Sequence, residues 1–253
     1  MKFPKFLSDT LIIFRINILA LRTALIPFLV ISIVIPIGLT YLISLASFTI
    51  TRESTLNYLI GALTLSLSLS IVNGVGQSIA QDKFLGKLEF YRTLPINPIS
   101  YVLGVTLTHL IAGLINMMTI LLIGGYLWGI IYLILNYLPI IIALSLTSCI
   151  ALIGIGAIIG TRAKNLNYAY MYSNIISIII TTITPAYYPQ TIQPSFIKII
   201  SQALPTTHTA NILRILLTSN TQSSIPINPI IMLAIITIIY LAIGFKGIKW
   251  IEK

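Results

Sequence analysis

The hydrophobic pattern divides the chain into long uncharged stretches separated by short charged ones. The longest stretch lies between Arg92 and Arg162 and has room for two membrane spans. A helix that crosses the hydrocarbon core of a bilayer needs about 20 apolar residues. The pattern therefore predicts an all-α polytopic membrane protein with a single transmembrane domain, 1–253. Its six transmembrane helices are expected at 24–48, 57–80, 100–124, 138–160, 166–184 and 226–245.

Two features refine the expected helix packing. Residues 125–137 (GYLWGIIYLILNY) are rich in Trp and Tyr, which gather at membrane–water interfaces, so we expect them to connect the third and fourth spans. Gly156 and Gly160, like Gly125 and Gly129, have the spacing G-x-x-x-G, which lets helix backbones approach closely in a membrane.

The first 23 residues carry an amphipathic pattern of their own. Apolar residues recur at helical spacing on one face, with Lys5, Arg15 and Arg22 off that face. The members of this stripe are Phe3, Leu7, Leu11, Phe14, Ile18 and Leu21. The pattern favours a helix over 1–23 that lies in the membrane surface. The alternative is a plain cytoplasmic extension of the first span.

Composition and charge place the protein in a membrane and orient it. The chain is 57% hydrophobic and 8% charged, whereas soluble domains carry about 25% charged residues. The net charge is +10, but the basic residues form no stripe, which argues against nucleic acid as a partner. Twelve of the fifteen Lys and Arg fall on the side of the two termini. The positive-inside rule then predicts a multi-pass protein of the cell (plasma) membrane, with both termini and segment 81–99 cytoplasmic and segment 185–225 external.

Polar residues form stripes on three of the predicted spans. They are Ser66, Ser70, Asn73 and Gln77 in the second span, Thr106, His109, Gly113 and Asn116 in the third, and Tyr170, Asn174, Ser177 and Thr181 in the fifth. Such residues should face protein or a cavity, because amides are costly in lipid. One interpretation is hydrogen bonding between helices. The other, for the second and fifth spans, is a translocation path.

Several kinds of chemistry are not indicated. The two histidines, His109 and His208, are far apart in the sequence, and no acidic residue lies within a span, so neither a metal site nor a proton relay is expected. We interpret His109 and Cys149 as packing residues. No Walker A or G-x-G-x-x-G pattern occurs, so we expect no catalytic residue, cofactor site or metal on this chain.

The stretch QDKFLGKLEFYRTLPINPIS, which begins at Gln81, holds five of the twenty charged residues. Its spacing predicts a short amphipathic helix. Phe84, Leu88 and Tyr91 would pack toward the membrane domain. Asp82, Gly86, Glu89 and Thr93 would form the opposite face. The charge indicates either a solvated loop or a surface for a soluble partner.

The order of residues in this segment resembles the permease subunits of ABC-2 type transporters. The matching elements are Asp82-Lys83, then Gly86-Lys87-Leu88-Glu89, then Leu94-Pro95-Ile96, between two spans. A second similarity lies in Leu204–His208 and Asn211–Leu216 before the last span, and a third in Gly-Phe-Lys at 244–246.

This resemblance implies one half of a permease dimer, either a homodimer or a related heterodimer, surrounded by membrane lipid. Two copies of an ABC ATPase subunit, which bind the ATP and Mg, would dock beneath it. The resemblance assigns ATPase coupling to segment 82–94 and its proline exit, and places the second and fifth spans near the dimer interface. It also implies an external segment with short helices that re-enter the membrane. The residues concerned are Asp82, Lys83, Gly86, Leu88, Glu89, Arg92 and Pro95 for coupling, and Pro205, His208 and Arg214 for the external segment.

The resulting expectation is an exporter of an amphipathic or hydrophobic cargo, such as a drug, lipid or peptide. Two alternative functions are compatible with the sequence. The first is an ATP-independent secondary transporter or channel, in which backbone carbonyls hold sodium. The second is a membrane anchor for a cytoplasmic complex.

Overall fold

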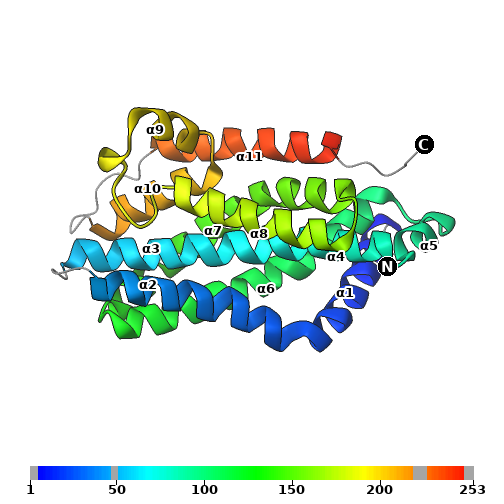
Figure 1. Ribbon diagram of the computed structural model, residues 1–253, viewed down its shortest axis with the longest axis horizontal. Helices are drawn as coiled ribbons and strands as arrows, with labels where there is room; N and C mark the ends of the chain where they lie inside the picture. The colour runs from blue at the N-terminus through cyan, green and yellow to red at the C-terminus, as the bar shows by residue number, and fades with distance from the viewer. Residues whose placement is uncertain (1–4, 47–50, 219–226, 248–253) are drawn as a thin grey trace.

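The computed structural model describes residues 5–46, 51–218 and 227–247, which fold almost wholly into helices (Figure 1). The described residues contain no β-strand, so the all-α prediction is confirmed. Phe3 and the extreme ends of several predicted segments lie outside the described residues. The elements are α1 (Lys5–Leu29), the π-helical turn η1 (Val30–Val34), α2 (Ile35–Ala46), α3 (Arg52–Ser68), the π-helical turn η2 (Leu69–Asn73), α4 (Gly74–Phe84), α5 (Lys87–Thr93), α6 (Pro98–Leu127), α7 (Ile131–Arg162), α8 (Leu166–Ile183), the 3-10 turn η3 (Gln190–Ile192), α9 (Ser195–Gln202), α10 (Pro205–Thr218) and α11 (Ile227–Gly247).

Four helices of the described chain are long and apolar enough to cross a membrane. They are the continuous helix Arg52–Phe84, Pro98–Leu127, Ile131–Arg162 and Ile227–Gly244. Four of the predicted spans lie over these helices. The first predicted span falls partly on Val30–Ala46, which is apolar but short, and the fifth on α8, where Asn167 and Asn174 lower the hydropathy. The count of six spans therefore stays a prediction.

The connection between α6 and α7 is much shorter than predicted. Helix α6 runs to Leu127 and α7 begins at Ile131, which leaves a turn of Trp128–Ile130. Gly129 has φ 67°, a left-handed conformation that glycine adopts without steric cost. Gly129 therefore makes the tight turn, whereas Gly125 lets α7 approach α6, since a Cβ there would lie 2.7 Å from Ile134 Cδ1.

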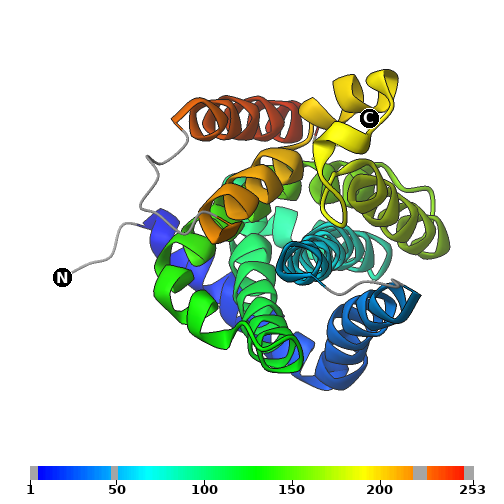
Figure 2. The ribbon, with the colours of Figure 1, turned by 90° about the vertical axis from the view of Figure 1, so that its left-hand side faces the viewer.

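The helix formed by α3, η2 and α4 occupies the centre of the bundle. In the end-on view of Figure 2, α3 is surrounded by α2, α6, α8 and α10. The most apolar window of Arg52–Phe84 is 100% buried, compared with 22% for the last candidate span. This helix also carries a series of buried serines, which explains its position, since polar side chains find partners inside the protein and not in lipid.

Glycines allow α7 to approach the central helix. A Cβ on Gly160 would lie 2.7 Å from the carbonyl oxygen of Gly76 in α4, and one on Gly156 would lie 3.1 Å from Val75 Cβ. The close approach predicted for the Gly156 and Gly160 spacing is therefore present. On its other side α7 meets α11, where Gly154 faces Gly244.

The turns between helices and the ends of the described chain lie at the two ends of the bundle. Figure 1 shows the α4–α5 turn, the beginning of α1 and the end of α11 at one end, with the α6–α7 turn at the other. We call these the α5 end and the α10 end. Lys5 and Lys246 lie at the α5 end and are exposed, which fits the predicted clustering of basic residues on the side of the termini.

Helix α1 packs along α6. Ile13 is fully buried, and a Cβ on Gly104 of α6 would lie 2.6 Å from its Cγ2. Leu7 and Leu11 of the predicted apolar stripe remain 45% and 50% exposed. The helix therefore uses a different face for packing and leaves this part of the stripe free for lipid. It continues to Leu29 and so extends beyond the predicted 1–23.

Replacing Gly160 with Ala should destabilise the protein by about 1–3 kcal/mol, because the added methyl group overlaps backbone atoms of α4. The matched control is Gly38→Ala in α2, where nothing lies within 4 Å of an added Cβ. That change should be neutral or stabilise the helix by up to about 1 kcal/mol. Thermal unfolding of both variants in detergent measures the difference, and equal effects would contradict the glycine contact.

Candidate functional site

The candidate site is the turn between α4 and α5. Helix α4 ends at Phe84, and Gly86 follows with φ 74°, a conformation that ends helices because glycine lacks a Cβ. The amides of Leu85 and Gly86 donate to the carbonyls of Gln81 (2.9 Å) and Lys83 (3.3 Å). The single helix predicted over 82–94 is therefore wrong: Gly86 divides it into the end of α4 and the separate helix α5.

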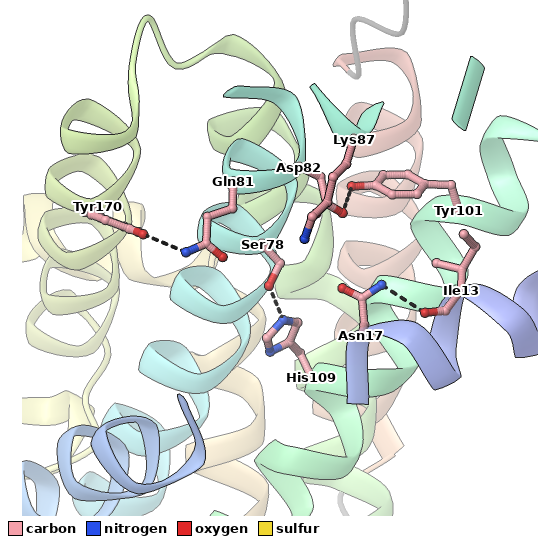
Figure 3. A network of polar contacts seen from close by, with 9 residues as sticks. All are labelled: Ile13, Asn17, Ser78, Gln81, Asp82, Lys87, Tyr101, His109 and Tyr170. Atoms are coloured by element: carbon pink, nitrogen blue, oxygen red, sulfur yellow. Dashed lines mark hydrogen bonds and ion pairs between the residues drawn. The ribbon is translucent and has the colours of Figure 1, made fainter. Parts of the chain in front are cut away.

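Asp82 is the buried anchor of this turn (Figure 3). The hydroxyl of Tyr101 in α6 donates to Asp82 Oδ2 at 2.9 Å, and the Lys87 ammonium lies 3.7 Å from Oδ1. Asp82 is 6% exposed, so its predicted place on an exposed face is wrong. The turn at Gly86 brings Lys87 of α5 back over the carboxylate, and Tyr101 covers it from α6. The carboxylate thus joins three helices.

Apolar contacts hold α5 against the rest of the protein. Leu88 and Tyr91 are 3% and 6% exposed, as their spacing predicts, whereas Phe84 is 39% exposed because it precedes the turn. The ring centroids of Tyr91 and Tyr101 lie 5.6 Å apart. Burial raises the pKa of Tyr91, and the nearby Asp82 carboxylate raises it further.

The opposite side of the turn is exposed and carries both apolar and charged side chains. Leu85 and Phe90 are 61% and 60% exposed, and Glu89 is exposed beside them. Large exposed apolar side chains around a charge are typical of a protein contact surface. We call the exposed residues of this turn the α5 surface: Phe84, Leu85, Gly86, Lys87, Glu89, Phe90, Thr93, Leu94 and Pro95. The side chain of Arg92, also predicted for coupling, lies outside the described atoms.

Two further contacts tie the end of α4 to its neighbours. Lys83 Nζ donates to the carbonyl of Thr161 near the end of α7 at 3.1 Å, and Gln81 Nε2 donates to the hydroxyl of Tyr170 in α8 at 3.1 Å (Figure 3). A cation beside the last carbonyls of a helix is favourable. A displacement of α4 at this end would therefore disturb its contacts with α6, α7 and α8.

The polar stripe predicted for the second span is divided among three neighbours, η1, α6 and α8. Ser66 Oγ donates to the carbonyl of Ser32 at 2.7 Å, and Ser70 Oγ lies 2.8 Å from Asn116 Nδ2 in α6. Asn73 Nδ2 instead donates to Asn174 Oδ1 in α8 at 2.8 Å. The π-helical turn η2 changes the helical phase between Ser70 and Asn73, so the four residues do not share one face.

The stripe of α8 faces the central helix over most of its length. Ser177 Oγ donates to the carbonyl of Ser68 at 3.1 Å, and Ser177 and Thr181 are buried. Tyr170 and Gln77 are half-buried, and Asn174 is exposed beside its contact with Asn73. Hydrogen bonds between helices thus account for most of both stripes. The exposed part, around Asn174, is the portion available for a translocation path.

The third stripe, on α6, also turns inward. His109 is 2% exposed, and its Nε2 lies 2.8 Å from Ser78 Oγ of α4 (Figure 3). Gly74 leaves room for the imidazole, because a Cβ there would overlap it.

Cys149 of α7, like His109, is buried. No group of three or more metal-ligating side chains occurs among the described residues.

We keep the name external segment for the described part of 185–225, because the sequence predicts that it is external. It is built around Arg214 of α10. Its Nε donates to Asn57 Oδ1 in α3 at 2.7 Å, and its Nη2 donates to the carbonyls of Pro185 (2.8 Å) and Tyr188 (3.1 Å). Burial lowers the pKa of Arg214, and the charge of Glu53 opposes this effect. The guanidinium therefore joins α10, the central helix and the chain after α8.

The other two predicted residues of this segment lie close by. Pro205 begins α10, a position that suits proline because the first helical N–H needs no partner. His208 Nε2 lies 2.8 Å from the carbonyl of Gln202, so this nitrogen carries the proton. These contacts fix α9 to α10.

A groove of about 390 Å³ opens on the side of the bundle between α2 and α8. Ile35, Leu39 and Ile178 give it an apolar lining, and Asn174, Tyr187 and Tyr188 add polar groups. No charged residue lines it. The exposed part of the α8 stripe thus faces an uncharged groove.

Three of these hydrogen-bond partners could not be predicted from the sequence. Tyr101, Asn57 and Ser32 are single polar residues at the ends or middle of apolar helices, and nothing in their local pattern marks them. Only the buried carboxylate, the guanidinium and the serine hydroxyl that they contact reveal their roles.

In a comparison with known families, the model of a family described as ABC-2 family transporter protein matches residues 42–246. This range includes the α4–α5 turn, α8 and α10, and it begins within α2. No curated protein matches the chain significantly.

Replacing Tyr101 with Phe should destabilise the packing of α5 by about 1.5–3 kcal/mol, because the buried Asp82 loses a charge-assisted hydrogen bond. The matched control is Tyr126→Phe at the other end of α6, where the side chain is 83% exposed. Hydrogen exchange of residues 85–94 in the purified protein should rise only in the first variant. Equal exchange in both would show that the bond does not hold α5.

Replacing Arg214 with Lys should loosen the external segment, because an ammonium cannot reproduce the planar array of guanidinium donors. We expect faster proteolysis between residues 185 and 218, with a loss of about 1–3 kcal/mol in stability. The control is Arg15→Lys in α1, an exposed site. If both variants resist protease like the parent, the Arg214 contacts do not hold the segment.

Proposed function

Because the chain belongs to the ABC-2 family of transporter proteins, we propose that it is the permease subunit of an ATP-driven exporter whose ATPase is a separate chain. The observation that carries the proposal is the α5 surface, in which exposed apolar side chains surround charged ones above the buried carboxylate of Asp82. A solvated loop would not need Phe90 and Leu85 exposed together, nor Asp82 buried beneath them.

The contacts beneath the α5 surface indicate how a displacement of α5 would be transmitted to the membrane domain. Leu88 and Tyr91 seat α5 on the protein, and Asp82 links it to α4 and to Tyr101 of α6. A displacement of α5 that broke these contacts would take Lys87 away from a carboxylate that stays buried, and a buried charge without its partner is costly. The movement is therefore passed to α4, the inner part of the central helix.

The proposed topology has six spans. The segment containing Val30–Ala46 and helix α8 would cross the membrane beside the four apolar helices, since both lie along the central helix in Figures 1 and 2. The α5 end, with both termini, would face the cytoplasm of the cell, where an ATPase and its Mg and ATP are found. The α10 end would face outward.

A second permease chain, identical or related, would complete the transporter. Asn174 is exposed on α8 beside an apolar groove, and an amide that faces lipid is costly. A partner chain against α2 and α8 would shield it. Two permease chains would then bind two ATPase subunits, one beneath each α5 surface.

The cargo would be amphipathic or hydrophobic, of the drug, lipid or peptide class. The groove between α2 and α8 carries no charged side chain, and its polar groups are hydroxyls and one amide. An apolar lining with few polar groups suits such a molecule. A cargo with several charges would lose its hydration there without compensation.

Co-purification and transport test this function directly. The tagged full-length chain should retain an ATPase subunit, and the reconstituted complex should move a fluorescent short-chain phospholipid across vesicle membranes only with ATP. Transport without ATP would indicate a secondary transporter or channel. A bound partner without any transport would indicate a membrane anchor.

Replacing Phe90 with Ala should weaken the binding of the ATPase subunit at least roughly tenfold, because a large exposed aromatic residue is a typical contact hot spot. The matched control is Phe196→Ala in α9, which is similarly exposed, at 66% against 60%, but lies outside the α5 end. Pull-down of the ATPase by each variant measures the difference. Equal retention would place the docking surface elsewhere.

A further inference from the structure

Two π-helical turns lie part-way along the bundle, both within reach of α6. η1 separates α1 from α2, and η2 separates α3 from α4. The two turns are linked, because Ser66 Oγ, one turn before η2, donates to the carbonyl of Ser32 in η1 at 2.7 Å. Single π turns inside longer helices are frequent at functional sites.

One side chain holds both turns. Asn116 of α6 donates from Nδ2 to Ser32 Oγ at 2.7 Å and to Ser70 Oγ at 2.8 Å. Gly113, one helical turn earlier, has no side chain between α6 and η2: an added Cβ would lie 3.5 Å from Ile71 Cδ1. Asn116 and Ser70 are fully buried, and Ser32 is 2% exposed.

The amide of Asn116 is not fully used in this arrangement. Its Oδ1 is buried and has no hydrogen-bond partner among the described residues. Exchanging the positions of the amide oxygen and nitrogen would leave the nitrogen unused instead. Asn73 Oδ1, in η2, is likewise buried without a partner among the described residues. Each of these oxygens is an acceptor that a second arrangement of the turns can use.

The sequence around η2 also fits a second arrangement. In a regular α-helix Ser66, Ser70, Asn73 and Gln77 share one face, but η2 directs Ser70 to α6 and Asn73 to α8. A π turn corresponds to one extra residue in an α-helix, which rotates the following segment by roughly 100°. Loss or migration of η2 would rotate α4, and the α5 surface with it, relative to α3.

We propose that η1, η2 and Asn116 form one hinge, at which the inner parts of the first two spans move relative to their outer parts during transport. Asn116 is a positioning residue that couples the two turns, so that they rearrange together. The proposal rests on the proposed function for its link to transport. The coupling of the two turns can be measured without it.

Hydrogen exchange of the purified full-length chain in lipid nanodiscs tests the coupling. In Asn116→Leu the amides of 30–34 and 69–73 should exchange about five- to tenfold faster, although the two segments belong to different helices. Exchange in α10 should not change. The matched control is Thr106→Val, another buried polar residue of α6 with no bond to a π turn. Unchanged exchange in either π turn, or equal changes in the control, would overturn the proposal.

A second measurement addresses transport. In the complex with its co-purified ATPase, Asn116→Leu should keep its rate of ATP hydrolysis within about twofold. It should carry at least fivefold fewer fluorescent phospholipids per ATP than the Thr106→Val complex. An unchanged ratio would refute the role of the hinge in transport. If the parent complex itself moves no phospholipid, the proposed function fails, and the exchange result alone decides whether the two turns are coupled.

Discussion

Lipid offers no hydrogen-bond partners, and this constraint determines where the polar side chains of the spans can lie. The central helix, Arg52–Phe84, carries Ser66, Ser68, Ser70 and Asn73 in an otherwise apolar segment. Placing it in the middle of the bundle lets each neighbouring helix supply partners: the carbonyl of Ser32, the amide of Asn116 and the amide of Asn174. The outer helices can then remain almost wholly apolar where they face lipid. Glycines at the contacts with α7 bring the backbones close enough for this packing.

The same helix connects the two ends of the molecule. At the α10 end Asn57 accepts from Arg214, which holds the external segment, and at the α5 end Asp82 holds α5. Both contacts involve a charged group and partners from other helices, and both are partly or wholly buried. The surface proposed to meet the ATPase and the segment proposed to face outward are therefore attached to opposite ends of one buried helix. Along this helix, a change at one end can reach the other only through its π turn η2.

The sequence predicted the helical class, six spans of which four lie over long apolar helices, and the burial of Leu88 and Tyr91, because these follow from length and periodicity. It did not predict the division at Gly86, since a glycine inside an amphipathic pattern is compatible with a continuous helix until its backbone conformation is known. It placed Asp82 on an exposed face, because periodicity cannot show that Tyr101 approaches from another helix. It also treated Ser66 to Gln77 as one stripe. The π turn that divides them depends on tertiary contacts and leaves no signature in the residue spacing.

The strengths of these contacts differ along the central helix, and this difference indicates where the protein can bend. Bonds to charged groups, as at Asp82 and Arg214, are worth roughly 1.5–3 kcal/mol, whereas a neutral hydrogen bond between membrane helices averages about 0.6 kcal/mol. The hydrogen bonds that hold the middle of the helix, at Ser66, Ser68, Ser70 and Asn73, are all neutral, and this part contains the irregular turn η2. Force applied at either end therefore meets firm attachments there and weaker ones at the centre. A helix fixed more strongly at its ends than in its middle moves its ends as rigid pieces and changes shape between them.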